Sequence, residues 1–354
     1  MTNIATTDAT QATANATAGV NWIRLGGFLF GMIFLFALPF LVRDQYQLHL
    51  AQLIGIYWIL IGGLNLVVGY SGQLSVGHVG LLAVGAYSFA ILAGKYDVPP
   101  LLALASSGIF GGACGFLLGL PSLRLPGFYF AMVTLAFAVI VNEQSVAQSN
   151  LTGGGVGLPV PGFSAPFASP AGFYWLVLTI ASVVTWMSWN VARLMWGRAL
   201  VAVRDSEVAA RSVGVSVYKT KLIVFVMSGV TAGVAGALFA SLQSYITPDT
   251  FVFDLGLFFF TCIIIGGRGS IIGPFIGTVI LTALPELAAP LAKLGNLFYG
   301  VLLLAVVLLT PDGFGRLLER LLVRFRPVRD ASTVVNPAPD RLRAALRSNG
   351  VRGR

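Results

Sequence analysis

The stretch GYSGQLSVGHVGLLAVGAY, residues 69–87, stands between an apolar run that ends WILIGGLNLVV and a second apolar run that continues to residue 94. It carries four glycines from position 69 to position 80, and glycine disfavours the interior of a helix. A tight turn would need only two or three turn residues. We therefore expect residues 69–78 to interrupt the helical structure between two apolar segments.

The composition around this stretch is that of an integral membrane protein. Of 354 residues, 56% are hydrophobic and only 10% are charged, whereas soluble domains carry roughly 25% charged residues. A helical span needs about 20 apolar residues. We predict an all-α polytopic helical bundle with these ten membrane segments: 25–42, 49–69, 77–94, 99–120, 127–146, 172–190, 222–243, 252–266, 270–289 and 296–311.

Three of these segments, 77–94, 252–266 and 296–311, are short for a span and are compatible with tilted, broken or re-entrant helices. The transmembrane domain is expected over residues 24–311. It is flanked by a small polar tail, residues 1–23, predicted to be disordered, and by a basic tail, residues 312–354. The cysteines lie inside apolar runs, so we expect them to pack as small hydrophobic residues.

Basic residues predict the orientation of the chain, because cytoplasmic loops carry an excess of arginine and lysine. The loop 191–221 and the tail 312–354 are both basic, and four predicted segments separate them, so both can lie in the cytoplasm. Of the 22 basic residues, only three then lie outside: Arg43, Lys95 and Lys293. Both termini are therefore expected in the cytoplasm. Membrane lipids, rather than nucleic acid, are the expected partners of the +9 net charge.

Small residues recur at four-residue spacing in three places. Such spacing lets helices approach closely in lipid, where no hydrophobic force drives them together. We expect it to serve packing within the chain rather than contact with another subunit. The residues are Gly111, Gly115 and Gly119, Gly229 and Gly233, and Gly273 and Gly277.

The largest basic loop reads GRALVAVRDSEVAARSVGVSVYKTKL, residues 197–222. Asp205 or Ser206 can cap the start of a helix, and Gly214 can end it. A short helix is therefore predicted at the cytoplasmic surface of the membrane.

Within this helix, Glu207 lies at spacings from Arg204 and Arg211 that allow surface ion pairs. Ala209 and Ala210 form a small patch on which another surface can dock closely. The helix is either a handle for a soluble partner or part of a solvated loop that only connects two spans.

A resemblance to a known family, carried by three motifs, favours the first of these two interpretations. EVAARSVG resembles the coupling loop of bacterial ABC-importer permeases, with two alanines, three residues and then Gly214. The opening stretch and GGRGSIIGPFIGTVILTALPEL, residues 266–287, resemble the permeases for branched-chain amino acids. The resemblance covers residues 50–311, and the chain is most similar to the M-type subunit of the two-permease pair.

The resemblance implies the partners of an importer: two ABC ATPase subunits, a homologous second permease and a periplasmic substrate-binding protein. It also implies a bacterial inner membrane location. The ATPases would bind ATP, since this chain lacks a G-x-x-x-x-G-K-[ST] phosphate-binding loop. The chain is thus expected to be a transport subunit rather than an enzyme, with no cofactor of its own. The implied ATPase-coupling residues are Arg204, Glu207, Ala209, Ala210, Arg211 and Gly214.

In a transporter, broken helices offer freed backbone groups and polar side chains to a solute. We therefore predict that the strip, residues 69–78, lines the translocation pathway. The alternative is a cytoplasmic turn that packs against a neighbour. A metal site is not expected, because no Cys, Asp, Glu or second His lies near His78 in the sequence. The predicted pathway residues are Ser71, Gly72, Gln73, Ser75, Gly77 and His78.

Other functions stay open. Related permeases serve urea, short amides and aromatic acids, so the substrate is not fixed. An ion-coupled secondary transporter usually needs acidic or histidine relays within its spans, and these segments are nearly free of charge. An intramembrane enzyme would have only His49 and His78 as histidine bases. Glu286 near the membrane is a functional candidate, although pairing with Lys293 would give it a structural role.

Overall fold

The apolar segments form helices because backbone N–H and C=O groups in lipid must be hydrogen-bonded within the chain. The computed structural model describes residues 35–40, 44–121, 125 and 127–288. Its elements are α2 (Gln45–Asn65), η1 (Leu66–Tyr70), α3 (His78–Gly94), α4 (Pro100–Gly119), α5 (Gly127–Ala147), α6 (Ser149–Thr152), β1 (Leu158–Pro159), α7 (Pro170–Arg193), α8 (Met195–Asp205), α9 (Glu207–Ser212), α10 (Val217–Gln243), β2 (Tyr245–Ile246), η3 (Pro248–Phe251), α11 (Phe253–Gly266) and α12 (Gly273–Ala288).

The all-α fold class is confirmed. The two strands are two residues long each and pair antiparallel, with Leu158 opposite Ile246. They form the one sheet within the described residues.

The predicted membrane segments agree with the helices where the structure describes them. Six helices of the described part are long and apolar enough to cross a membrane, and α3 and α12 are shorter apolar helices. These eight coincide with the predicted segments from 49–69 to 270–289. The segment 296–311, most of 25–42, and both tails lie outside the described residues.

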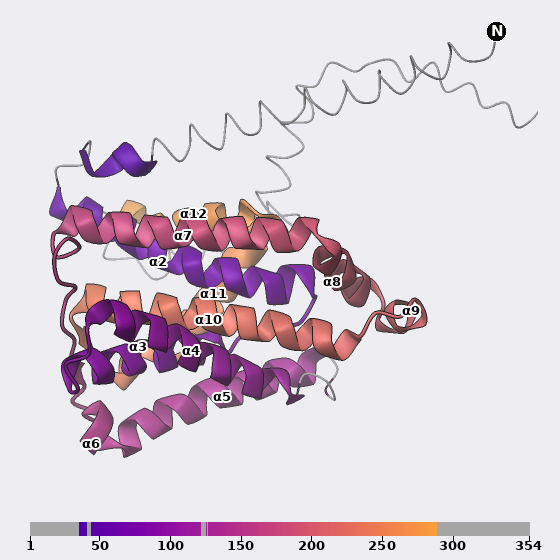
Figure 1. The fold of residues 1–354 in the computed structure, drawn as a ribbon, viewed down its shortest axis with the longest axis horizontal. Helices are drawn as coiled ribbons and strands as arrows, with labels where there is room; N and C mark the ends of the chain where they lie inside the picture. The colour runs from indigo at the N-terminus through magenta and orange to yellow at the C-terminus, as the bar shows by residue number, and fades with distance from the viewer. Residues whose placement is uncertain (1–34, 41–43, 122–124, 126, 289–354) are drawn as a thin grey trace, which may run out of the picture. The chain divides into compact units, whose positions relative to one another are not determined.

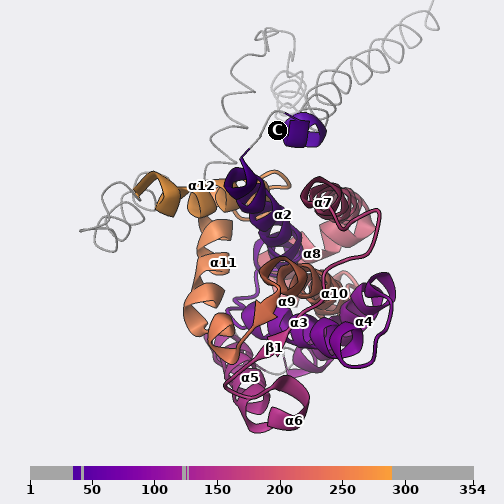
Figure 2. The same cartoon turned by 90° about the vertical axis from the view of Figure 1, so that its left-hand side faces the viewer.

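Helix α10 packs against α4, α3 and α2. Figures 1 and 2 show it running along the bundle with these helices around it. Glycines permit the contact with α4, since a Cβ atom at Gly111 would overlap the carbonyl oxygen of Gly229, and one at Gly229 would overlap the carbonyl oxygen of Gly111. A Cβ atom at Gly277 would likewise overlap the carbonyl oxygen of Cys262, in α11. The glycine spacing therefore serves packing within the chain, as expected.

The predicted cytoplasmic loop contains more helix than its sequence indicated. Only one short helix was expected there, but α8 precedes it, from Met195 to Asp205. In Figure 1, α8 and α9 lie at the end of the bundle opposite α6. Helix α9 packs against both α8 and α10.

Candidate coupling and translocation site

The predicted break lies between α2 and α3. Helix α2 ends in the π-helical turn η1, in which the Ser71 N–H group donates to the Leu66 carbonyl oxygen at 3.1 Å. Residues 71–77 are not helical, and α3 begins at His78. The predicted interruption is thus present over residues 71–77, whereas Gly69 and Tyr70 still belong to η1 and His78 already belongs to α3. π-helical turns are rare and often occur at functional sites.

Three polar side chains of the strip already have partners within the chain. The Ser71 hydroxyl donates to the carbonyl oxygen of Val67 at 2.7 Å. Ser75 Oγ and His78 Nδ1 share a hydrogen bond of 2.8 Å, and all three side chains are buried. These groups hold the strip in its conformation. Among the described residues, no cluster of potential ligands forms a metal site around His78.

The strip ends against α5. A Cβ atom at Gly77 would overlap the backbone of Thr134, so this position has room only for glycine. The Thr134 hydroxyl oxygen accepts from the backbone N–H groups of Val76 and Gly77, at 3.3 and 3.4 Å. The start of α3 is thereby fixed to its neighbour.

Gln73 differs from the other polar residues of the strip. Its side chain is 7% exposed, and neither its amide oxygen nor its amide nitrogen has a hydrogen-bond partner among the described residues. Leaving buried polar atoms unpaired costs about 1–3 kcal/mol, so such groups are rare and need a reason. Gln73 is thus the side chain of the strip with free hydrogen-bonding capacity.

Asn65, at the end of α2, was not identified from the sequence. Its amide nitrogen donates to the carbonyl oxygen of Ser270 at 2.8 Å, and its amide oxygen accepts from the N–H group of Gly269 at 3.1 Å. The side chain is 3% exposed. An amide in the middle of an apolar run is the signal that could have revealed it, because buried polar groups need partners. Asn65 ties the loop between α11 and α12 to the end of α2, just before the strip.

The side chain of Arg204, near the end of α8, also reaches the end of α2, where the strip begins. Its Nη1 donates to the carbonyl oxygen of Gly69 at 3.1 Å, and its Nε lies 3.2 Å from Oδ1 of Asp205. The sequence placed Arg204 beside Glu207, but the structure gives it these partners instead. The predicted coupling loop and the predicted pathway strip are therefore in direct contact.

Helix α9 has the predicted boundaries. The Ser206 hydroxyl accepts from the N–H group of Ala209 at 3.2 Å, and Gly214 has a φ of 82° just after the helix. Ala210 is only 1% exposed and packs with Val203 and Val217. Ala209 is exposed. Of the two alanines, Ala209 is thus the one that another protein can reach.

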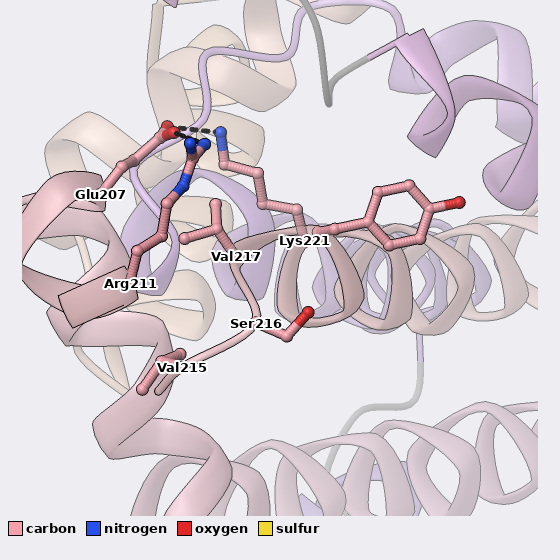
Figure 3. A pocket seen from close by; sticks show the side chains of 7 residues that line it. Glu207, Arg211, Val215, Ser216, Val217 and Lys221 are labelled. Carbon is pink, nitrogen blue, oxygen red and sulfur yellow. Dashed lines mark hydrogen bonds and ion pairs between the residues drawn. The ribbon is translucent and has the colours of Figure 1, made fainter. Parts of the chain in front are cut away.

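Glu207 connects α9 to α10, as Figure 3 shows. Its Oε1 lies 2.6 Å from Nζ of Lys221, and its Oε2 lies 3.5 Å from Nη2 of Arg211. The Arg211 pair was predicted, whereas Lys221, whose side chain is 9% exposed, was not. These three residues border a cleft of about 260 Å³ that is also lined by Val215, Ser216, Val217 and Tyr218.

Residues 47–307 match the family described as branched-chain amino acid transport system / permease component. The chain belongs to this permease family.

Curated relatives agree with this assignment. The permease is 34% identical over 304 residues to the high-affinity branched-chain amino acid transport system permease protein LivM of Escherichia coli (strain K12), covering 78% of this chain and 71% of the relative. It is 30% identical over 298 residues to the autoinducer 2 import system permease protein LsrC of Enterobacter sp. (strain 638), covering 76% and 80%. No solved structure matches the permease.

The permease is a membrane protein in which the two predicted sites adjoin. Gly72, which has a φ of 72°, lies against Arg204 of α8. The strip and the predicted coupling loop therefore meet at a glycine. Glu286 falls within α12, but its side chain lies outside the described part of the structure.

Proposed function

We propose that this chain is the M-type permease subunit of a bacterial ABC importer. With a second, homologous permease it would form the pathway for branched-chain or similar amino acids. Two ABC ATPases would drive transport, and a periplasmic binding protein would deliver the substrate. The observation that carries this proposal is α9, a short capped helix joined by Arg204 of α8 to the strip.

The coupling role is assigned to both faces of α9. Val208 is 79% exposed and Ala209 is exposed beside it, so these residues would contact the ATPase. Ala210 would act by fixing α9 to the bundle, and Gly214 by ending the helix where φ is positive. Glu207 and Arg211 would hold the helix through their ion pair.

For the pathway, the proposal gives different roles to the strip residues. Gln73 would contact the solute, which its unpaired buried amide supports. Ser71, Ser75 and His78 would keep the strip in place through the hydrogen bonds already described. Gly72 and Gly77 would permit the backbone course. Uncharged groups suit a permease, because passage requires that the solute be released.

The names of the relatives support the amino-acid substrate without fixing it. The Escherichia coli relative is named for branched-chain amino acids, and a 24% identical protein of Methanocaldococcus jannaschii carries a similar name. Other relatives are named for autoinducer 2 and for L-arabinose. One permease architecture thus occurs with solutes of different polarity, which keeps urea, short amides and aromatic acids as alternative substrates.

The orientation is part of the proposal. The chain would be a multi-pass protein of the inner membrane with α8, α9 and both termini in the cytoplasm. The basic residues of α8 and of the following loop support it, because the positive-inside bias sets orientation.

Reconstitution of the complete complex tests the function. We expect uptake of labelled leucine into proteoliposomes that depends on ATP and on the binding protein, with less uptake of urea and benzoate. Uptake that follows an ion gradient without ATP would contradict the ABC assignment. Preferential uptake of urea or benzoate would overturn the amino-acid assignment alone.

A variant pair tests the docking face. Ala209→Trp places a large side chain on the exposed side of α9, so we expect the ATPase to be lost on co-purification. Val156→Trp, at a position that is 77% exposed in the connection between α6 and β1, is the matched control. Retention of the ATPase by Ala209→Trp would show that α9 is not the docking element.

A further inference from the structure

Arg204 is separated from Gly69 by 135 positions, yet its side chain ends on the carbonyl oxygen of that glycine. The last carbonyl groups of a helix have no partner within the helix, and Gly69 belongs to the last helical turn, where the strip begins. A charged donor makes a stronger hydrogen bond than a neutral one. Arg204 therefore holds the point at which α2 stops being a helix.

Two glycines from distant parts of the chain lie beside the arginine. A Cβ atom at Gly72 would lie 2.6 Å from Cγ of Arg204, and one at Gly269 would lie 3.5 Å from its Nη1. Both glycines have positive φ angles, 72° and 75°. A side chain at Gly72 would crowd the arginine, whereas a Cβ atom at Gly269 would only come into ordinary contact with it. The strip and the loop between α11 and α12 together form the seat of Arg204.

This seat is connected to the membrane helices. Asn65 of α2 binds both Gly269 and Ser270 through its amide group. A displacement of Arg204 thus acts on the end of α2, on the strip and on the loop before α12. These are parts of the chain that sequence order keeps far apart.

The other end of Arg204 is next to the coupling helix. Ser206, the cap of α9, is two positions further along the chain, and its N–H group donates to the carbonyl oxygen of Ala202 in α8. Because α8 and α9 are so closely joined, movement of α9 moves the backbone of Arg204. The Arg204 side chain is 33% exposed, and its guanidinium is directed to Gly69 in the bundle.

We propose that Arg204 is a positioning residue that transmits the displacement of α9 to the strip. This inference rests on the proposed function, and it gives Arg204, one of the expected ATPase-coupling residues, a role inside the bundle. Movement of α9 would pull on Gly69 and change the course of residues 71–77, where Gln73 lies. Loss of the arginine would leave ATP hydrolysis in place and separate it from transport.

The test compares three variants of the complete complex in proteoliposomes. Arg204→Met keeps the aliphatic part that lies against Gly72 but removes the donors, and Arg204→Lys keeps the charge and a donor. Arg198→Met, at an exposed position of the same helix, is the control. Both leucine uptake and binding-protein-stimulated ATP hydrolysis are measured, so that the ratio of uptake to hydrolysis is obtained.

We expect the ratio to fall about tenfold in Arg204→Met, the scale of one lost hydrogen bond to a charged group. The lysine variant should recover part of it, and Arg198→Met should match the parent. An unchanged ratio in Arg204→Met would overturn the proposal, as would a parallel loss of uptake and hydrolysis in an intact complex. A parent complex without ATP-driven uptake would instead refute the proposed function itself.

Gly72→Ala carries the same test if Arg204→Met does not assemble. The methyl group added at position 72 would lie 2.6 Å from Cγ of Arg204 and displace that side chain. ATP hydrolysis should therefore again continue while leucine uptake falls. Where Arg204→Met does assemble, the double variant Gly72→Ala/Arg204→Met is also measured. Its ratio of uptake to hydrolysis should be no lower than that of the more affected single variant, because both changes break the same contact between Arg204 and the strip. Additive losses would overturn the proposal.

Discussion

His78 and Ser228, 150 positions apart, share a hydrogen bond of 2.7 Å between Nε2 and Oγ. Ser228 lies in α10 and His78 begins α3, and both side chains are buried. With Ser75 on its other ring nitrogen, the imidazole uses both nitrogens within the chain. A histidine between two hydroxyl groups is a structural connection between the strip and the central helix.

Removing this connection should destabilise the permease. Ser228→Ala leaves a buried ring nitrogen unpaired, and we expect a loss of about 1–3 kcal/mol in the free energy of unfolding. Thermal unfolding in detergent measures it. Ser106→Ala is the control, since the Ser106 hydroxyl is exposed and bonds only within α4. Equal melting temperatures for the two variants would contradict a structural role for His78.

Gln73 and Gln52 offer a matched comparison. Both are buried, but the Gln52 amide nitrogen donates to the carbonyl oxygen of Pro170 at 2.7 Å, whereas the Gln73 amide is unpaired. We expect Gln52→Leu to lower thermal stability and Gln73→Leu to preserve or raise it. Leucine uptake should nevertheless fall in Gln73→Leu. Full uptake by a stable Gln73→Leu complex would show that this amide has no part in transport.

We expect Glu207 to contribute more to the stability of the permease than an exposed ion pair within one helix would. An exposed ion pair such as that with Arg211 is worth about 0.3–0.5 kcal/mol, but Lys221 is nearly buried and depends on the same carboxylate. We expect Glu207→Gln to lower stability by about 1–2 kcal/mol, and Arg211→Gln by less. Adding Lys221→Met to Glu207→Gln should recover stability. Identical melting temperatures for Glu207→Gln and Arg211→Gln would contradict the role of Lys221.

The contact between α4 and α10 should not tolerate side chains. Gly111→Leu places atoms where the carbonyl oxygen of Gly229 lies, and overpacking typically costs about 1–3 kcal/mol, occasionally more. We expect lower yield and a lower melting temperature. At Gly155 an added Cβ atom would meet no atom within 4 Å, so the same substitution should be tolerated there. Normal folding of Gly111→Leu would show that these helices separate easily.

Thiol labelling tests the orientation. With the free cysteines Cys114 and Cys262 replaced by alanine, single cysteines are introduced at Val156 and at Val213, which are 77% and 75% exposed. An impermeant reagent applied from outside the inner membrane should label the first and not the second. Labelling of Val213→Cys from outside would reverse the proposed orientation.

What the sequence determined are the features that depend on near neighbours. Hydropathy marks the six described helices that can cross a membrane and the two shorter apolar helices, because each is defined by its own run of residues. The cap at Ser206 and the end at Gly214 were predictable for the same reason, since capping bonds join residues three or four positions apart. The interruption after Tyr70 follows from its glycines.

What only the tertiary structure decided are the partners of polar groups. Arg204 was expected beside Glu207, one helical turn away, but it binds Gly69, and Glu207 binds Lys221. Asn65 finds its partners at Gly269 and Ser270. Such groups bond to whatever the packing of helices brings within about 3 Å, and that packing is set by glycine contacts and side-chain shapes across the whole bundle.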